Sequence, residues 1–180
     1  MACRRGYFDE ERFANALVGI AQLLPYNESI GAGGEPLKTL VEDSVCGDKA
    51  VLAVALLRIA GYETCVLDIN EPTRHAAIAV HLSKPPRFAI KAIFRAGGKG
   101  NWTFWWSEEW SEDPWYVVFK GRRYYVVESV VLHTIGTLLW PSAFKRGLVG
   151  LGWPYHGEKP EKIHHIETAK ADSQPVSILS

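Results

Sequence analysis

The stretch VEDSVCGDKAVLAVALLRIAG, residues 41–61, decides the fold because it predicts one long helix that is apolar almost all round. Asp43 and Ser44 are candidate N-caps, and Asp48 in the first turn complements the positive end of the helix dipole. Gly61 is a typical C-terminal stop. A helix without a polar face belongs in the centre of a domain. We therefore expect a sheet to pack against it.

Cys46 stands at the head of this helix. Cys46, Ala50, Ala53 and Leu57 fall along one face, where the alanines allow close approach of another element. The unpaired N–H groups and the positive dipole end of a helix N-terminus lower the pKa of a thiol. Free cysteines are also often small buried hydrophobes. Cys46 is therefore either a packing residue or a nucleophile that faces a sheet.

The bulk composition predicts one globular domain over residues 1–156 and a polar C-terminal arm or tail over 157–180. The chain has 180 residues, of which 47% are hydrophobic, which is enough for a single core. Twenty basic and twenty acidic residues cancel, so nothing in the charge favours nucleic acid as a partner. We expect no membrane span and no signal peptide, and free thiols favour the cytoplasm.

Residues on both sides of the central helix complete an α+β pattern. Residues 8–24 have apolar side chains at helical spacing and stop at Pro25, which predicts an amphipathic helix. Strand-forming residues follow the central helix, and the sequence KGRR predicts a turn between the last two strands, so we expect an antiparallel sheet. The predicted strands are 62–69, 75–82, 115–119 and 124–131.

His75 and Glu128 are polar residues within these predicted strands. His75 shares its strand face with Ala77 and Ala79, which leaves room for a facing helix. Glu128 is a lone carboxylate in an apolar strand, where an acid needs a partner. Each residue could simply be packed or solvated. A thiol nucleophile, however, needs an imidazole and a group that orients it, and the sequence offers one candidate for each.

Four segments together resemble the transglutaminase-like superfamily, whose members share a papain-like core and include thiol proteases, amidases and acyltransferases. The segments are LVGIAQLLPY, PLKTLVEDSVCGDKAVLAVALLRIAGYE, RHAAIAV and YYVVES, and they span residues 17–129 apart from one insert. Cys46, Asp48 and Lys49 match the family's Gly-Asp-Cys-acid-Asp-Lys pattern. Three positions beside the cysteine differ, since Ser44 and Val45 replace the Gly-Asp before it and Gly47 replaces the acid after it.

This resemblance implies a papain-like core in which Cys46 is the nucleophile, His75 the general base and acid, and Glu128 the group that orients His75. Gln22 is then either an oxyanion-hole donor or a cap of its own helix. The implied function is a cysteine protease or amidase (a hydrolase), or an acyltransferase, that acts on peptide or protein substrates through a thioester. The alternative is a catalytically inactive descendant that serves as an interaction or structural module.

Residues 85–114 form an insert rich in glycine and tryptophan, to which the sequence assigns no regular structure. Its tryptophans could line a cleft for peptide or sugar, form a lid, anchor a protein partner or pack over the core. The C-terminal arm could bind a partner in the same way. The sequence has no phosphate-binding loop and no metal motif, so we expect neither cofactor nor metal. The four tryptophans are Trp102, Trp105, Trp106 and Trp110.

Overall fold

The structure is a computed structural model that describes residues 3–4, 7–27, 35–40, 44–70, 74–87, 89–97, 101–109, 114–137 and 149–164. The helices are α1 (Glu10–Gln22), α2 (Pro36–Thr39) and α3 (Cys46–Ile59). The strands are β1 (Cys3–Arg4), β2 (Tyr7–Phe8), β3 (Thr64–Ile69), β4 (His75–Val80), β5 (Ala89–Gly97), β6 (Asn101–Glu109), β7 (Tyr116–Phe119), β8 (Arg122–Glu128), β9 (Leu132–His133), β10 (Val149–Leu151) and β11 (Lys162–His164).

The central helix α3 begins at Cys46, but its N-cap is not one of the predicted residues. Val45 is the N-cap, and the Asp48 carboxylate accepts its backbone N–H at 3.2 Å. The prediction for Ser44 was wrong because its hydroxyl donates instead to the Pro25 carbonyl, at 2.8 Å. Asp43 lies outside the described residues. Gly61 follows the helix with a φ of +92°, which confirms it as the stop.

Six strands form one antiparallel sheet in the order β10-β3-β4-β8-β7-β11, which confirms the α+β class. The predicted turn between β7 and β8 is present. Lys120 and Gly121 have φ values of 51° and 72°, as the tight turn of a two-residue hairpin requires. Strand β4 lies inside the sheet, and each of its residues is buried.

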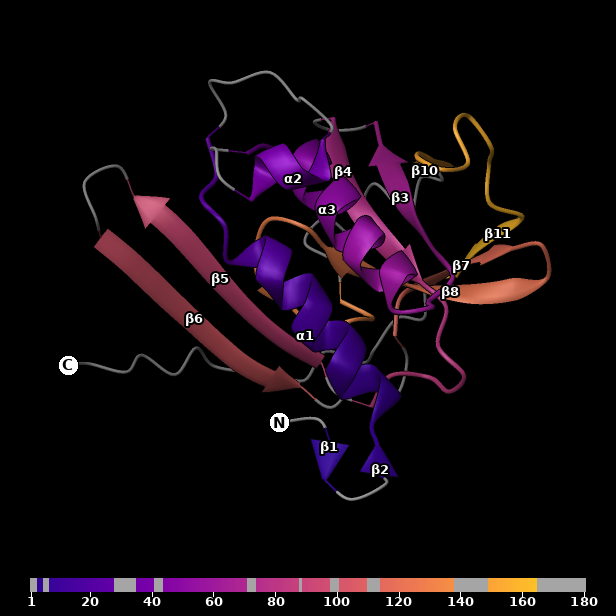
Figure 1. Cartoon of the computed structure of the whole chain (residues 1–180), viewed down its shortest axis with the longest axis horizontal. Helices are drawn as coiled ribbons and strands as arrows, with labels where there is room; N and C mark the ends of the chain where they lie inside the picture. Colours follow the sequence, from indigo (N-terminus) through magenta and orange to yellow (C-terminus); the bar gives the residue numbers. More distant parts are fainter. Residues whose placement is uncertain are drawn as a thin grey trace.

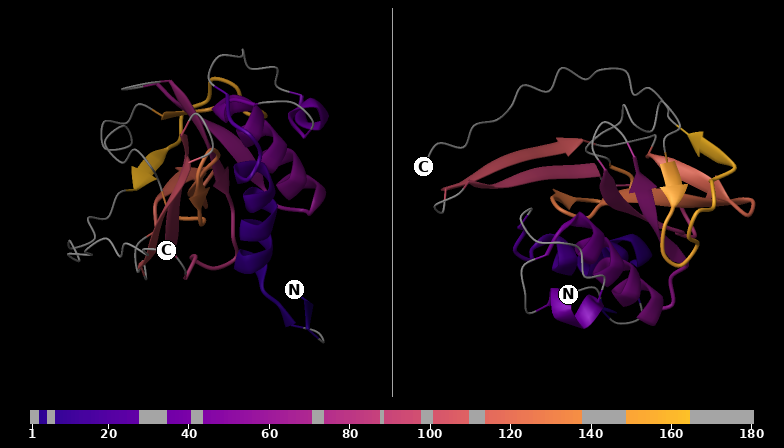
Figure 2. Two further views of the ribbon diagram at one scale, coloured as in Figure 1. Left: turned by 90° about the vertical axis from the view of Figure 1, so that its left-hand side faces the viewer. Right: turned by 90° about the horizontal axis from the view of Figure 1, so that it is seen from above.

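The helices α1 and α3 cover one face of this sheet, so the domain has two main layers (Figure 1, Figure 2). Leu52 and Leu57 of α3 pack there with Ile78 of β4. A second apolar cluster, which includes Leu67 and Leu151, covers the other face of the sheet. Burial on both faces fixes the register of β4, because a slip by one residue would exchange its two sets of side chains.

The insert forms a long hairpin of β5 and β6, a structure that the sequence did not predict. Each strand has nine residues, and β9 pairs with the other side of β5. The hairpin extends past the helices to one side of the six-stranded sheet (Figure 1, Figure 2). Trp102, Trp105 and Trp106 belong to β6, where only the backbone is described, and Trp110 lies outside the described residues.

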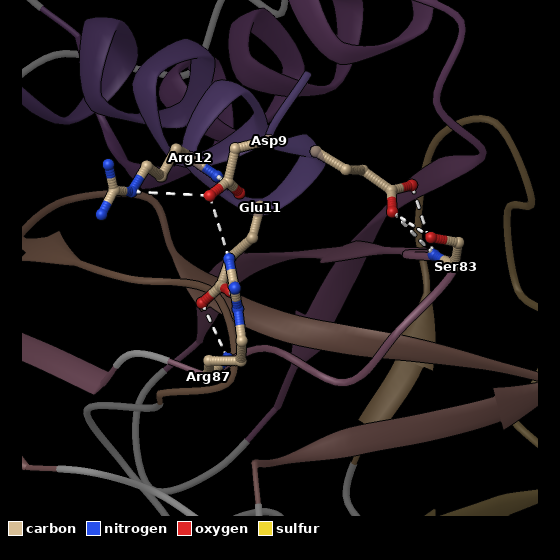
Figure 3. A network of polar contacts seen from close by, with 6 residues as sticks. Asp9, Glu11, Arg12, Ser83 and Arg87 are labelled. Carbon is tan, nitrogen blue, oxygen red and sulfur yellow. Dashed lines mark hydrogen bonds and ion pairs between the residues drawn. The ribbon is translucent and has the colours of Figure 1, made fainter. Parts of the chain in front are cut away.

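Acidic residues at the start of α1 hold the segment that leads into this hairpin (Figure 3). The Arg87 guanidinium donates to Asp9 at 2.9 Å and to Glu11 at 3.1 Å. The backbone N–H and the hydroxyl of Ser83 both donate to the Glu10 carboxylate. These contacts attach residues 83–87 to the N-terminal turn of α1.

The first part of the predicted C-terminal arm belongs to the sheet. Strand β11 pairs with β7 and forms one edge of the six strands, while residues 165–180 lie outside the described residues. Within the parts of the chain that the structure describes, no helix is long and apolar enough to cross a membrane.

Candidate active site

Three secondary-structure elements bring Cys46, His75 and Glu128 together. Cys46 is the first residue of α3, His75 is the first of β4, and Glu128 is the last of β8. Strands β4 and β8 are neighbours, with Ala77 opposite Glu128. His75 is therefore the diagonal neighbour of Glu128 on the same sheet face, within reach of a long side chain. The prediction that a helix packs over Ala77 and Ala79 was wrong, because both belong to the cluster on the sheet face opposite α3, while α3 packs on Ile78.

The His75 imidazole and the Glu128 carboxylate form a buried pair. The distance from Nε2 to Oε2 is 2.7 Å, and the two side chains are 4% and 0% exposed. An acid at this depth needs such a partner, because burial of a carboxylate without one is costly. The bond also fixes the ring, since Nδ1 is the nitrogen that remains for the thiol.

The Cys46 sulfur lies among three hydrogen-bonding groups: the His75 ring, the Ala76 backbone N–H and the Gly47 backbone N–H. Burial alone would raise the pKa of this thiol, but the bonds and the charge of His75 lower it below its ordinary value. Burial would likewise lower the pKa of His75, yet its bonds to Cys46 and Glu128 raise that pKa to about 9. Both shifts favour a thiolate beside an imidazolium.

Cys65 of β3 provides a contrast within the same domain. It is 1% exposed and belongs to the apolar cluster on the far face of the sheet. Burial raises the pKa of its thiol to about 12. Cys46 is thus the described cysteine whose surroundings favour the thiolate.

Gln22, the predicted oxyanion donor, hydrogen-bonds to the backbone next to the site. Its amide nitrogen donates to the backbone carbonyls of Glu128, at 2.8 Å, and His133, at 2.9 Å. These two bonds use both amide hydrogens and attach the end of α1 to the chain around Glu128. A bond to an oxyanion would require Gln22 to give up one of these carbonyls, and that role stays a prediction.

Lys49 is a further buried polar residue of the site, and its role was not predicted from the sequence. It lies one turn after Cys46 and is 1% exposed. Its ammonium donates to the carbonyls of Leu24, at 2.6 Å, and Gln22, at 3.2 Å. Burial lowers its pKa to about 8. The sequence signal was a lysine beside Asp48 in the first turn of a mostly apolar helix, where a buried charge requires a fixed partner.

Comparisons of the chain with protein-family models, with curated proteins and with solved structures found no match. Fold class and chemistry therefore have to be inferred from the residues and the geometry of this chain alone. The domain is α+β, with a cysteine at the N-terminus of its central helix and a buried imidazole–carboxylate pair on its sheet. Within the described ranges, no cluster of three His, Cys, Asp or Glu side chains could hold a metal ion.

Proposed function

We propose that this protein is a thiol enzyme of the transglutaminase-like type, built on a papain-like core, that cleaves or transfers acyl groups at amide bonds of peptides or proteins. The observation that carries the proposal is the hydrogen-bonded series Cys46–His75–Glu128, in which the acid–base pair is buried and the thiol begins a helix. A thiolate at a helix N-terminus beside a protonated imidazole is the arrangement that makes cysteine a nucleophile.

The reaction follows from these positions. The Cys46 sulfur attacks the carbonyl carbon of the substrate, and the carbonyl electrons move to oxygen. The first backbone N–H groups of α3 lack partners within the helix, so the N–H of Cys46 is a candidate donor to that oxyanion. His75 then passes its Nδ1 proton to the departing amine, and a thioester remains on Cys46.

Water or a second amine completes the cycle. His75 takes a proton from the incoming nucleophile, which attacks the thioester carbon and releases the thiolate. Water gives hydrolysis, and an amine gives acyl transfer. Glu128 holds a hydrogen on Nε2 throughout, so Nδ1 is the atom that exchanges protons.

A second candidate function is that of a catalytically inactive interaction module. Two features favour it: Gly47 departs from the family pattern beside the cysteine, and the β5–β6 hairpin extends from the domain body (Figure 2). The tryptophan-rich strand β6 or the C-terminal arm would then bind a protein partner.

Alkylation by iodoacetamide, followed by intact-mass mapping, separates the two candidates. The ordinary pKa of cysteine is about 8.5. If the protein is a thiol enzyme, Cys46 should be labelled selectively well below that pH, and labelling should be slower in His75→Ala. Cys65 is the internal reference and should stay unlabelled, because its thiol is buried. Labelling of Cys46 only at alkaline pH, with no effect of His75→Ala, would contradict the enzyme and favour the module.

A covalent trap then tests the acyl transfer step. The protein is incubated with a mixture of peptides at mildly acidic pH and analysed for thioester adducts by intact mass. An adduct on Cys46 that disappears in Cys46→Ala and is released by hydroxylamine would identify the acyl donor.

A further inference from the structure

Ser129 makes contacts that the reaction outlined above does not use. It follows Glu128 directly, and its side chain is 0% exposed. Its hydroxyl donates to the Ala76 carbonyl at 2.6 Å and lies 3.2 Å from the Cys46 carbonyl. Ala76 is the residue after His75, so one buried hydroxyl, on the residue that follows β8, contacts the backbone of both α3 and β4.

The position of Ala76 explains why this hydroxyl is needed. Backbone groups along β4 point alternately to its two neighbours, and the N–H of His81, just past β4, donates to Glu63 on the side of β3. Even-numbered residues such as Ala76 therefore point toward β8. The pairing of β4 with β8 ends at Ala77 and Glu128, so Ala76 lies one residue beyond the ladder.

Two groups of the site bond the backbone of Ala76 in place of a partner residue on β8. The Ser129 hydroxyl bonds the Ala76 carbonyl, and the Ala76 N–H bonds the Cys46 sulfur. The N–H and C=O of one strand residue point the same way, so a bond that holds the carbonyl also sets the direction of the N–H. Loss of the hydroxyl would leave a buried carbonyl unsatisfied and free this backbone to turn away from the sulfur.

We propose that Ser129 is a positioning residue: through the backbone of Ala76, and through its contact with the start of α3, it holds the Cys46 sulfur against His75. This inference rests on the proposed function, since it concerns the same thiol. Ser129 touches no reacting atom, and its effect is on the geometry that stabilises the thiolate.

The test compares the pH dependence of Cys46 alkylation in the wild type, in Ser129→Ala, and in the isosteric pair Ser129→Thr and Ser129→Val. The Thr and Val variants have the same size and differ by the hydroxyl alone, so their comparison decides the question if the alanine variant does not fold. Thr64→Val is the matched control, because the Thr64 hydroxyl is equally buried and bonds another β4 carbonyl, that of Ala79, at 2.7 Å.

If Ser129 has this role, the apparent pKa of Cys46 alkylation should rise by about one unit in Ser129→Ala and Ser129→Val. Labelling at acidic pH should then be about tenfold slower. Ser129→Thr should keep the wild-type profile, and Thr64→Val should lower the melting temperature without a change in the profile. A wild-type profile in Ser129→Val would overturn the role of Ser129. Failure of the proposed function is distinguishable, because the wild-type protein itself would then lack selective labelling that depends on His75.

Discussion

Replacement of Glu128 by glutamine tests how much the buried carboxylate contributes to the reactivity of the thiol. Glutamine keeps the size of the side chain and a hydrogen-bonding group but removes the charge that faces His75 at 2.7 Å. With the carboxylate, the pKa of His75 is about 9, against an ordinary value of 6.5. The difference of about 2.5 units corresponds to about 3 kcal/mol in favour of the protonated ring.

The expected loss of reactivity follows from these two values. At pH 7.5 an imidazole with a pKa of about 9 is about 97% protonated, whereas one at 6.5 is about 9% protonated. In Glu128→Gln, burial still lowers the pKa of the ring and the bond and charge of Cys46 still raise it, so we take the ordinary value as the reference, with these two effects opposed. The thiolate then loses its imidazolium in about nine of ten molecules. Alkylation of Cys46 at pH 7.5 should become about tenfold slower.

The assay is the second-order rate of iodoacetamide labelling between pH 5 and 9.5, together with an NMR titration of the His75 ring. Glu11→Gln is the control, because Glu11 is also a buried carboxylate but pairs with Arg87 at the far end of α1. The control should keep the wild-type profile. An unchanged rate in Glu128→Gln, with a His75 pKa still near 9, would refute the role assigned to the carboxylate.

Two further predictions concern stability. Lys49→Met should remove a pH dependence of the free energy of unfolding. In the wild type the pKa of Lys49 is about 8 in the folded state and 10.5 ordinarily, so the unfolded chain binds the proton more tightly. Wild-type stability therefore rises with pH between these two values. Urea unfolding should show the wild type gaining about 2 kcal/mol relative to Lys49→Met between pH 7.5 and 9.5, and a constant difference would contradict the cause given for the shift. Gly136→Ala should destabilise the protein by more than about 1 kcal/mol, because Gly136 has a φ of +97° and an added Cβ would lie 2.6 Å from Pro114. Gly19→Ala, in open space on α1, should instead stabilise it by about 0.5–1 kcal/mol, and thermal melts of the two variants that moved in the same direction would count against this contrast.

The sequence predicted those parts of the fold that depend on local pattern. The bounds of α3 followed from an apolar run with a glycine stop, and the strands from alternation around a short turn. Strand parity also indicated that Glu128 needs a partner. The pairing of Glu128 with His75 in the structure meets that need. These features depend on near neighbours in the chain, which the sequence displays directly.

The sequence did not predict the features that depend on distant partners, nor one hairpin whose composition conceals its strands. Ser44 has the chemistry of an N-cap, but a carbonyl 19 residues away takes its hydroxyl. The β5–β6 hairpin is held by pairing between its own two strands, and its glycines and tryptophans hid the alternation that marks a strand. The bonds of Gln22 reach 106 and 111 residues along the chain, to positions that no local pattern specifies.

The same long separations determine when, during folding, the Cys46 thiol acquires its lowered pKa. Cys46 and Gln22 are synthesised long before Glu128, and Ser129 closes its contact with Cys46 across 83 residues. Contacts of this range form late, since the entropy of closing a large loop has to be overcome first. A nascent chain that still lacks β8 therefore carries an ordinary cysteine. The lowered pKa of Cys46 depends on His75, and the pair of His75 with Glu128 forms only when β8 enters the sheet, so the reactivity that we propose for Cys46 would report completed folding.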